Sequence, residues 1–239
     1  MKKQYSLLFV FLLTVVSAAA QKPHAYFKID DMPDAVLYLP APPDSLSIRF
    51  AYDTAQYQWG KRQRATPRGQ QAKDDADYSI YRMATIFSPV IGVTISPNTT
   101  PRLWKLLTDA TYTASLGCDK AKAHYFRPRP YMYYNEPTLV PGDEEELRHN
   151  GSYPSGHTTL GWTTALILVE ICPQYENEIL RVGYEYGQSR VIAGYHWQSD
   201  VTAGRLVASS CFSRLHTSKT YLKQLKKAQK EYRKIRSAK

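Results

Sequence analysis

Three short clusters hold the residues whose types and spacing suit chemistry on an anion. The first places two long cations, Lys122 and Arg129, seven positions apart at the end of an expected helix. Arginine offers a planar fork of donors and lysine a compact charge, so the two can clamp one anion. Lys120 and Arg127 have the same spacing, so spacing alone leaves the register open. The alternative is that these cations only offset the negative end of a helix dipole.

The second cluster is the octapeptide GSYPSGHT, residues 151–158. Ser155 and Gly156 fall where a helix is expected to begin, and the free backbone N–H groups of a helix start can cradle a phosphate. The serine hydroxyl adds a donor, glycine lets a ligand approach closely, and His157 is placed to protonate a leaving group. A plain helix cap followed by a turn is the alternative.

The third cluster runs from Ser189 to Asp200. His196 and Asp200 are four positions apart, which predicts that they share a helix face. A carboxylate on one imidazole nitrogen fixes the tautomer and makes the other nitrogen more basic, which prepares a nucleophile or base. Arg190 supplies a third cation. The alternative is a solvent-facing pair beside a structural arginine.

Together the clusters resemble the K-x6-RP, PSGH and SR-x5-H-x3-D motifs of the type 2 phosphatidic acid phosphatase superfamily, in the same order. The octapeptide, the leader, the length and the single-domain layout resemble those of the bacterial class A non-specific acid phosphatases. The resemblance extends over about residues 70–220. It favours Lys122 and Arg129 over Lys120 and Arg127, because Arg129-Pro130-Tyr131 resembles the family's Arg-Pro-aromatic step.

The resemblance implies a secreted acid phosphatase that hydrolyses phosphate monoesters through a phosphohistidine. His196 is then the nucleophile, Asp200 orients it, and His157 is the general acid. The residues implied to hold the phosphoryl oxygens are Lys122, Arg129, Ser155, Gly156 and Arg190. No cofactor or metal is expected, because three cations and a helix start supply the charge that phosphoryl transfer needs. The sequence also lacks HExxH, EF-hand and Walker-type glycine patterns.

Helical periodicity dominates the chain beyond Gln71, and strand-like alternation is weak. We predict an all-α, single-domain helical bundle in which the apolar helix 158–172 is central. Residues 21–70 are predicted to be an irregular N-terminal segment with one short helix within 44–59. Residues 71–239 are predicted to form the helical acid phosphatase domain. Its expected helices are 73–87, closed by Pro89, then 99–125, 176–193, 197–215 and a basic amphipathic helix at the C-terminus.

The first twenty residues predict a signal peptide that is cleaved before Gln21. Two lysines precede an apolar run too short to span a membrane, and small residues follow it. We therefore expect a periplasmic protein without stable membrane insertion. The net charge is +10, but residues 219–239 hold nine basic residues and one acid. The body between leader and tail is neutral, so nucleic acid is not an expected partner.

Small-molecule phosphate monoesters are the expected partners, and the family resemblance implies a homodimer or larger homo-oligomer. Cys118, Cys172 and Cys211 are expected to be buried free thiols, with one disulfide plus an odd thiol as the alternative. His124 and His149 are expected on the surface. The rival functions are a vanadium-dependent haloperoxidase, a membrane lipid phosphate phosphatase and a non-enzymatic phosphate-binding protein. Haloperoxidases are usually longer chains, and the sequence has no apolar stretch long enough for the spans of a membrane phosphatase. A protein that only binds phosphate would not need His157 and His196 on opposite sides of the anion.

Overall fold

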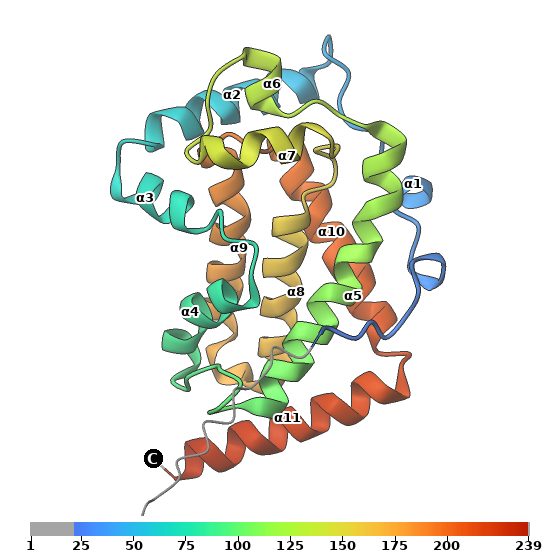
Figure 1. Cartoon of the computed structure of the whole chain (residues 1–239), viewed down its shortest axis with the longest axis vertical. Coiled ribbons are helices and arrows are strands. Elements are labelled where there is room, and N and C mark those ends of the chain that lie inside the picture. Colours follow the sequence, from blue (N-terminus) through green and yellow to red (C-terminus); the bar gives the residue numbers. More distant parts are fainter. Residues whose placement is uncertain (1–21, 239) are drawn as a thin grey trace, which may run out of the picture.

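The computed structural model describes residues 22–238, so the expected signal peptide lies outside the described residues. Within that range the chain forms helices and no strand, which confirms the all-α prediction. Long helices run side by side through the molecule, and α11 crosses one end of them (Figure 1). The helices that run side by side are α5 (Pro101–Tyr125), α8 (Gly156–Ile171), α9 (Glu176–Ala193) and α10 (Gln198–Leu215), and the crossing helix α11 comprises Lys219–Ser237.

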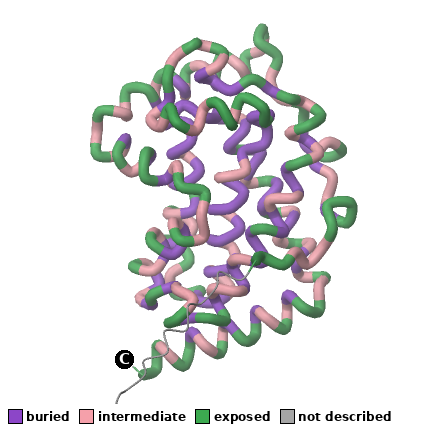
Figure 2. The backbone as a smooth tube through the Cα atoms, viewed as in Figure 1, coloured by how far each residue is buried: buried purple, intermediate pink, exposed green. Residues whose placement is uncertain are grey.

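Helix α8 packs against α5, α9 and α10. Most of its residues are apolar, or are small threonines and glycines, so it buries side chains on several faces rather than along one stripe. Figure 2 shows the buried backbone running along this part of the molecule. The main apolar cluster joins α8 to its neighbours through residues such as Leu106, Leu168 and Ile179. Burial of this kind stabilises the fold by roughly 1.5–3 kcal/mol per large apolar side chain.

Helix α11 is amphipathic, as the sequence predicted. It packs against α5 and α8, and its buried stripe comprises Tyr221, Leu225, Ala228 and Tyr232. The carboxylate of Glu231 accepts the backbone N–H groups of Arg102 (3.1 Å) and Leu103 (3.0 Å). These N–H groups lie in the first turn of α5 and have no partner within that helix. The acidic side chain of α11 therefore caps α5 at the end of the bundle away from the three motif clusters.

The segment 21–70, predicted to be mostly irregular, contains more helix than expected. The predicted short helix at 44–59 corresponds to α2, which begins and ends later. Helices α2 and α3 pack against α9, so the segment joins the bundle. Apolar periodicity is a weak signal in this segment. Helix α2, for example, buries only Asp53, Tyr57 and Gly60 and has no apolar stripe. The helices here are α1 (Ala35–Tyr38), α2 (Ile48–Gln63) and α3 (Pro67–Asp74).

The prediction of one helix over residues 73–87 is wrong. Helix α3 ends at Asp74, and α4 (Ile80–Ile91) begins after Ser79, whose hydroxyl accepts the N–H of Arg82 at 3.2 Å. Pro89 lies inside α4 instead of ending it. The apolar positions behind this prediction, among them Ile80, Met83 and Phe87, all lie in α4, so they gave no evidence for helix over residues 75–79. The turn between α3 and α4 includes Asp77 and Tyr78, which line the motif-bearing cavity described below.

Two short helices, α6 (Pro130–Tyr134) and α7 (Glu144–Arg148), lie in the connection between α5 and α8. The three cysteines are buried free thiols, as predicted. Across residues 22–238, no helix combines the length and the apolar character that crossing a membrane requires.

Candidate active site

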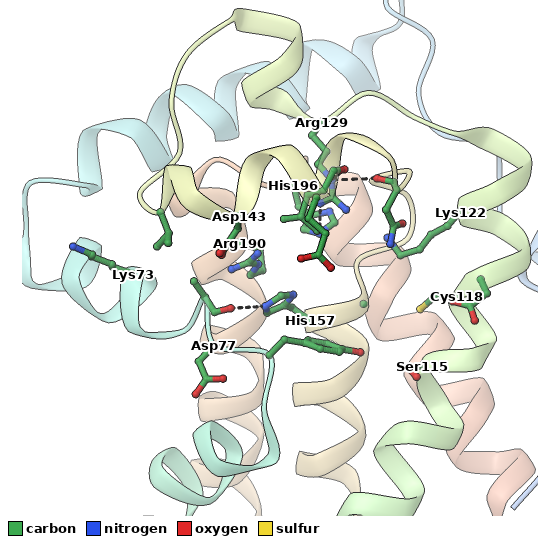
Figure 3. Close-up of a pocket in the computed structure, with 18 of the residues that line it drawn as sticks. Lys73, Asp77, Ser115, Cys118, Lys122, Arg129, Asp143, His157, Arg190 and His196 are labelled. Carbon is green, nitrogen blue, oxygen red and sulfur yellow. Dashed lines mark hydrogen bonds between the residues drawn. The ribbon is translucent and has the colours of Figure 1, made fainter. Parts of the chain in front are cut away.

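A cavity of about 870 Å³ opens where α5 and α9 end and where α8 and α10 begin. All three sequence clusters contribute to its wall, because each lies at one of these helix ends. Helix ends carry unpaired peptide groups and concentrated dipole charge, so the fold itself places polar groups here. Figure 3 shows the side chains that converge on this space. Those predicted from the sequence are Lys122, Arg129, Gly156, His157, Arg190 and His196.

The turn between α9 and α10 holds His196 at the cavity wall. Gly194 ends α9 with a φ of +90°, a conformation that glycine adopts readily. His196 Nδ1 lies 3.2 Å from Asp200 Oδ2, and the same oxygen accepts the Trp197 N–H at 2.9 Å. The predicted pairing is therefore present, but the two residues do not share a helix. His196 precedes α10, and Asp200 lies in its first turn and caps it.

The contacts of His196 define which ring nitrogen carries the proton. Arg129 Nη1 lies 3.1 Å from His196 Nε2. A guanidinium can only donate, so Nε2 accepts with its lone pair. The ring proton then resides on Nδ1, where it faces Asp200. This arrangement leaves Nε2 as the nitrogen with a lone pair, which is the form needed for nucleophilic attack.

Backbone carbonyls hold the two cations of the first cluster. Lys122 Nζ donates to the carbonyl oxygen of Gly151 at 2.7 Å. Arg129 lies beyond the end of α5, as the residue before α6, and its Nε donates to the carbonyls of Leu147 (3.1 Å) and Asn150 (3.2 Å). Neither cation forms an ion pair with a carboxylate in the part of the chain that the structure describes. Both charges are therefore available to an anion in the cavity.

The alternative pair with the same spacing lies elsewhere. Lys120 is at the surface, with its Nζ 3.2 Å from a carboxylate oxygen of Asp30. Arg127 is buried between the carboxylates of Asp53 and Asp200 and does not line the cavity. The structure thus brings Lys122 and Arg129 together at the cavity.

Arg190 is buried with two of its donors unused. Its side chain is 1% exposed, and its guanidinium carbon lies 4.1 Å from the centre of the Tyr195 ring. Among residues 22–238, no acceptor is within hydrogen-bonding distance of its Nε and Nη1 atoms. A buried donor left without a partner costs about 1–3 kcal/mol, and more when it is charged. An anion in the cavity would remove this cost.

The start of α8 also leaves space for a ligand. A Cβ atom on Gly156 would lie 3.8 Å from Tyr78 Oη and 4.0 Å from Lys122 Cε, so protein atoms do not fill this position. Ser155 differs, because it is fully buried and is not part of the cavity wall. Its Oγ accepts the N–H of Thr158 at 3.3 Å and caps the helix. The role of Ser155 as a phosphoryl ligand remains a prediction.

His157 points into the same space as His196 (Figure 3). Its Nε2 lies 2.9 Å from the carbonyl oxygen of Ala76, so Nε2 carries a proton and donates. The ring of Tyr78 is 4.7 Å from the His157 ring, centre to centre. A second proton, on Nδ1, would convert His157 into an acid.

Cations gather around the two histidines of the cavity, whereas carboxylates such as Asp77 and Asp143 lie elsewhere on its wall. Burial lowers the pKa of His196, and repulsion by Arg129, Lys122 and Arg190 lowers it further. The pKa of His157 is lowered mainly by burial and then by Arg190. Burial and the nearby Arg129 lower the pKa of Lys122 to about 8. Neutral imidazoles among closely spaced cations favour a bound dianion, and perturbed pKa values of this kind concentrate at functional sites.

The sequence clusters did not reveal one wall of the cavity. Asp77 and Tyr78 come from the turn between α3 and α4, Ser115 from α5, and Asp143 from the residues before α7. No local motif marks them, because only tertiary packing brings them to the site. His124 and His149 are exposed, as expected.

Comparison with known proteins agrees with the motifs. Residues 103–223 match the model of the PAP2 superfamily. The chain is 45% identical over 217 residues to a non-specific acid phosphatase of Providencia stuartii, across 90% of this chain and 88% of that protein. It is 40% identical over 232 residues to a non-specific acid phosphatase of Salmonella typhimurium (97% and 93%), and 34% identical over 205 residues to an acid phosphatase of Zymomonas mobilis (86% and 78%). The chain belongs to the PAP2 superfamily and, within it, to the bacterial non-specific acid phosphatases.

Proposed function

We infer that the protein is an acid phosphatase that hydrolyses phosphate monoesters and transfers the phosphoryl group to His196. The observation that carries this proposal is the pair of unused Arg190 donors, buried in the wall of a cavity that also contains the Nε2 lone pair of His196. The relatives' names support the same activity.

In the first step, Nε2 of His196 attacks phosphorus, and the bond from phosphorus to the ester oxygen breaks. The leaving oxygen takes the bonding electrons and receives a proton from His157. In the second step, water attacks the phosphohistidine, returns its proton to His157 and releases inorganic phosphate. Asp200 holds the Nδ1–H of His196 and stabilises the positive charge that the ring gains in the first step.

Lys122, Arg129 and Arg190, with the Gly156 amide, neutralise the phosphoryl oxygens. Catalysis of phosphoryl transfer depends mainly on positioning and charge stabilisation. Three cations offset a dianion and the charge of the transition state, so a metal is not required by this scheme. Metal independence remains part of the proposal.

The lowered pKa of His157 opposes its role as an acid in the empty site, because the free imidazole is then neutral near pH 7. A bound phosphate dianion screens Arg190, the main charge that depresses this pKa, and so makes protonation easier. Acidic conditions further increase the protonated fraction. The scheme therefore favours turnover below neutral pH.

Export to the periplasm rests on residues 1–20 and is proposed on that basis alone. Assembly into a homodimer or larger homo-oligomer remains a prediction.

Hydrolysis of a nitrophenyl phosphate monoester in the presence of a chelator tests the proposal. We expect turnover by the wild type, none by His196→Ala, and wild-type turnover by His149→Ala. His149 is the matched control, because its side chain is 80% exposed and lies outside the cavity wall. Circular dichroism should show equal helix content in all three proteins. Full activity in His196→Ala, or activity that the chelator abolishes, would contradict the proposal.

A further inference from the structure

Arg127 is a buried cation behind the candidate active site. Its side chain is 7% exposed and does not line the cavity. Nη1 donates to Asp200 Oδ1 at 2.6 Å, and Nη2 donates to Asp53 Oδ2 at 2.7 Å. Asp53 lies on α2 and Asp200 on α10. One guanidinium therefore joins two helices that are far apart in the sequence.

The two oxygens of Asp200 have separate partners. Oδ1 accepts from Arg127, whereas Oδ2 accepts the Trp197 N–H and faces His196 Nδ1. The carboxylate is fully buried and is fixed from both sides. Arg127 thus orients the carboxylate so that its other oxygen meets the imidazole.

Asp53 completes the arrangement from α2. It is 1% exposed, and its Oδ1 accepts the backbone N–H of Ser199 at 2.7 Å. Its Oδ2 accepts from the Ser199 hydroxyl at 2.5 Å and from Arg127. Ser199 lies in the first turn of α10, where backbone N–H groups lack helical partners. Asp53 therefore anchors the turn that carries Asp200.

The formal charges give Asp53 a second effect. Attack by Nε2 leaves the proton on Nδ1, so the His196 ring becomes positive as the bond to phosphorus forms. A buried guanidinium paired with Asp200 alone would cancel the carboxylate charge that stabilises this ring. With Asp53 present, the cluster of Asp53, Arg127 and Asp200 keeps a net charge of −1 beside His196. Charge complementarity in a buried site is strong because the effective dielectric constant is low.

We propose that Arg127 and Asp53 are positioning residues for phosphoryl transfer, holding Asp200 in place and preserving its negative charge next to His196. Asp53 lies outside the range matched by the PAP2 model, residues 103–223. The N-terminal helix α2 is then part of the working site. This inference rests on the proposed function, in which His196 is the nucleophile.

The test compares Asp53→Asn with Asp109→Asn. The control Asp109 is also a buried carboxylate, bound to Lys105 Nζ at 2.9 Å and to the His24 N–H at 3.0 Å, but it lies outside the cavity wall and has no contact with Arg127 or Asp200. We expect Asp53→Asn to lower kcat about 10-fold or more, as substitutions behind catalytic ligands commonly do, with little change in KM. The control should keep wild-type kcat. Thermal unfolding identifies the temperature at which both variants remain folded.

A double-mutant cycle then asks whether Asp53 acts through Asp200. In an Asp200→Asn background, Asp53→Asn should change kcat less than about 2-fold, because residues that share one network are not additive. Arg127→Lys should resemble Asp53→Asn, since lysine lacks the planar fork that spans both carboxylates.

The outcomes separate this inference from the proposed function. If the wild type forms no phosphohistidine at His196, the proposed function fails. If it does, but Asp53→Asn keeps wild-type kcat or has the same effect with and without Asp200, the inference alone is overturned.

Discussion

Arg127 and Arg129 are two residues apart in one Arg-Pro-Arg-Pro sequence, yet their surroundings differ completely. Arg127 forms ion pairs with two buried carboxylates. Arg129 contacts carbonyl oxygens and the neutral His196 ring, and, like Arg190 and Lys122, it has no carboxylate partner among the described residues. One arginine is neutralised by the protein itself. The others keep positive charges that, in the proposed function, a dianionic substrate neutralises.

The surroundings of each cation determine what its charge contributes. Removal of a paired cation leaves buried carboxylates without compensation, which costs stability. Removal of an unpaired cation from the cavity relieves repulsion but takes away a ligand for the phosphoryl group. Stability should therefore fall when the paired cation is removed but not when an unpaired one is, whereas activity should fall in both cases.

The largest expected effect is on the stability of an Arg127 variant. Arg127→Met should lower the free energy of unfolding by about 3–5 kcal/mol, the usual cost of breaking a buried ion pair. Arg190→Met should cause no loss, or a gain, because two of the arginine donors have no partner and burial disfavours its charge. Urea unfolding without phosphate or sulfate measures both. Equal losses in the two variants would remove the distinction between paired and unpaired cations.

The second effect concerns catalysis at Arg190. Arg190→Met should lower kcat/KM by about 10²–10³-fold, the range seen when one donor to a developing oxyanion is removed. Arg181→Met is the matched control, because Arg181 lies on the same helix with a side chain that is 67% exposed. It should keep wild-type kcat/KM for a nitrophenyl phosphate. A loss below 3-fold at Arg190 would show that its unused donors do not meet the substrate.

The pH profile should change in a defined direction. The pKa of His196 is lowered by burial and by its three cationic neighbours, so the wild-type ring stays neutral and able to attack in acid. Removal of one neighbour raises this pKa. In Arg190→Met, the acid limb of kcat/KM should therefore move to higher pH. Substrate ionisation affects wild type and variant alike, so the difference between their profiles isolates the enzyme. A shift to lower pH would contradict the electrostatic account.

The smallest effect is expected at Lys122. Its pKa is lowered to about 8, so it is charged below that pH and loses its charge above it. The inhibition constant of tungstate, which stays dianionic through this range, should rise above pH 8. At one unit above the pKa the rise is at most about 10-fold, since roughly a tenth of the lysine is still charged. Lys122→Arg should abolish this rise, and a wild-type constant that does not vary with pH would exclude the effect.

The sequence predicted the helices with continuous apolar spacing and the residues that carry compact motifs. Helix α9 and the tail helix α11 fall where periodicity placed them. The capped turn before α4 was missed, because the apolar spacing that begins at Ile80 was extended back over polar residues and the Ser79 cap is a weak local signal. Asp53 was missed for a different reason. Its role depends on contacts with Arg127 and Ser199, which lie more than 70 positions away, and no local pattern records them.

In the candidate site, too, the local motifs predicted some features and missed others. Lys122, Arg129, Gly156, His157, Arg190 and His196 meet at one cavity, as the motifs implied. The motifs also suggested that His196 and Asp200 share a helix face, whereas they flank the start of α10. Spacing of four residues suits both arrangements. Only the glycine turn after α9 decides between them.

Isolation of the phosphoenzyme would identify the residue that receives the phosphoryl group. Wild-type protein is mixed with a labelled phosphate monoester and quenched within milliseconds in alkaline denaturant, which preserves phosphohistidine. Peptide mapping should place the label on His196, and His196→Ala should carry none. Label on another residue, or turnover with no labelled protein at any time point, would contradict the account.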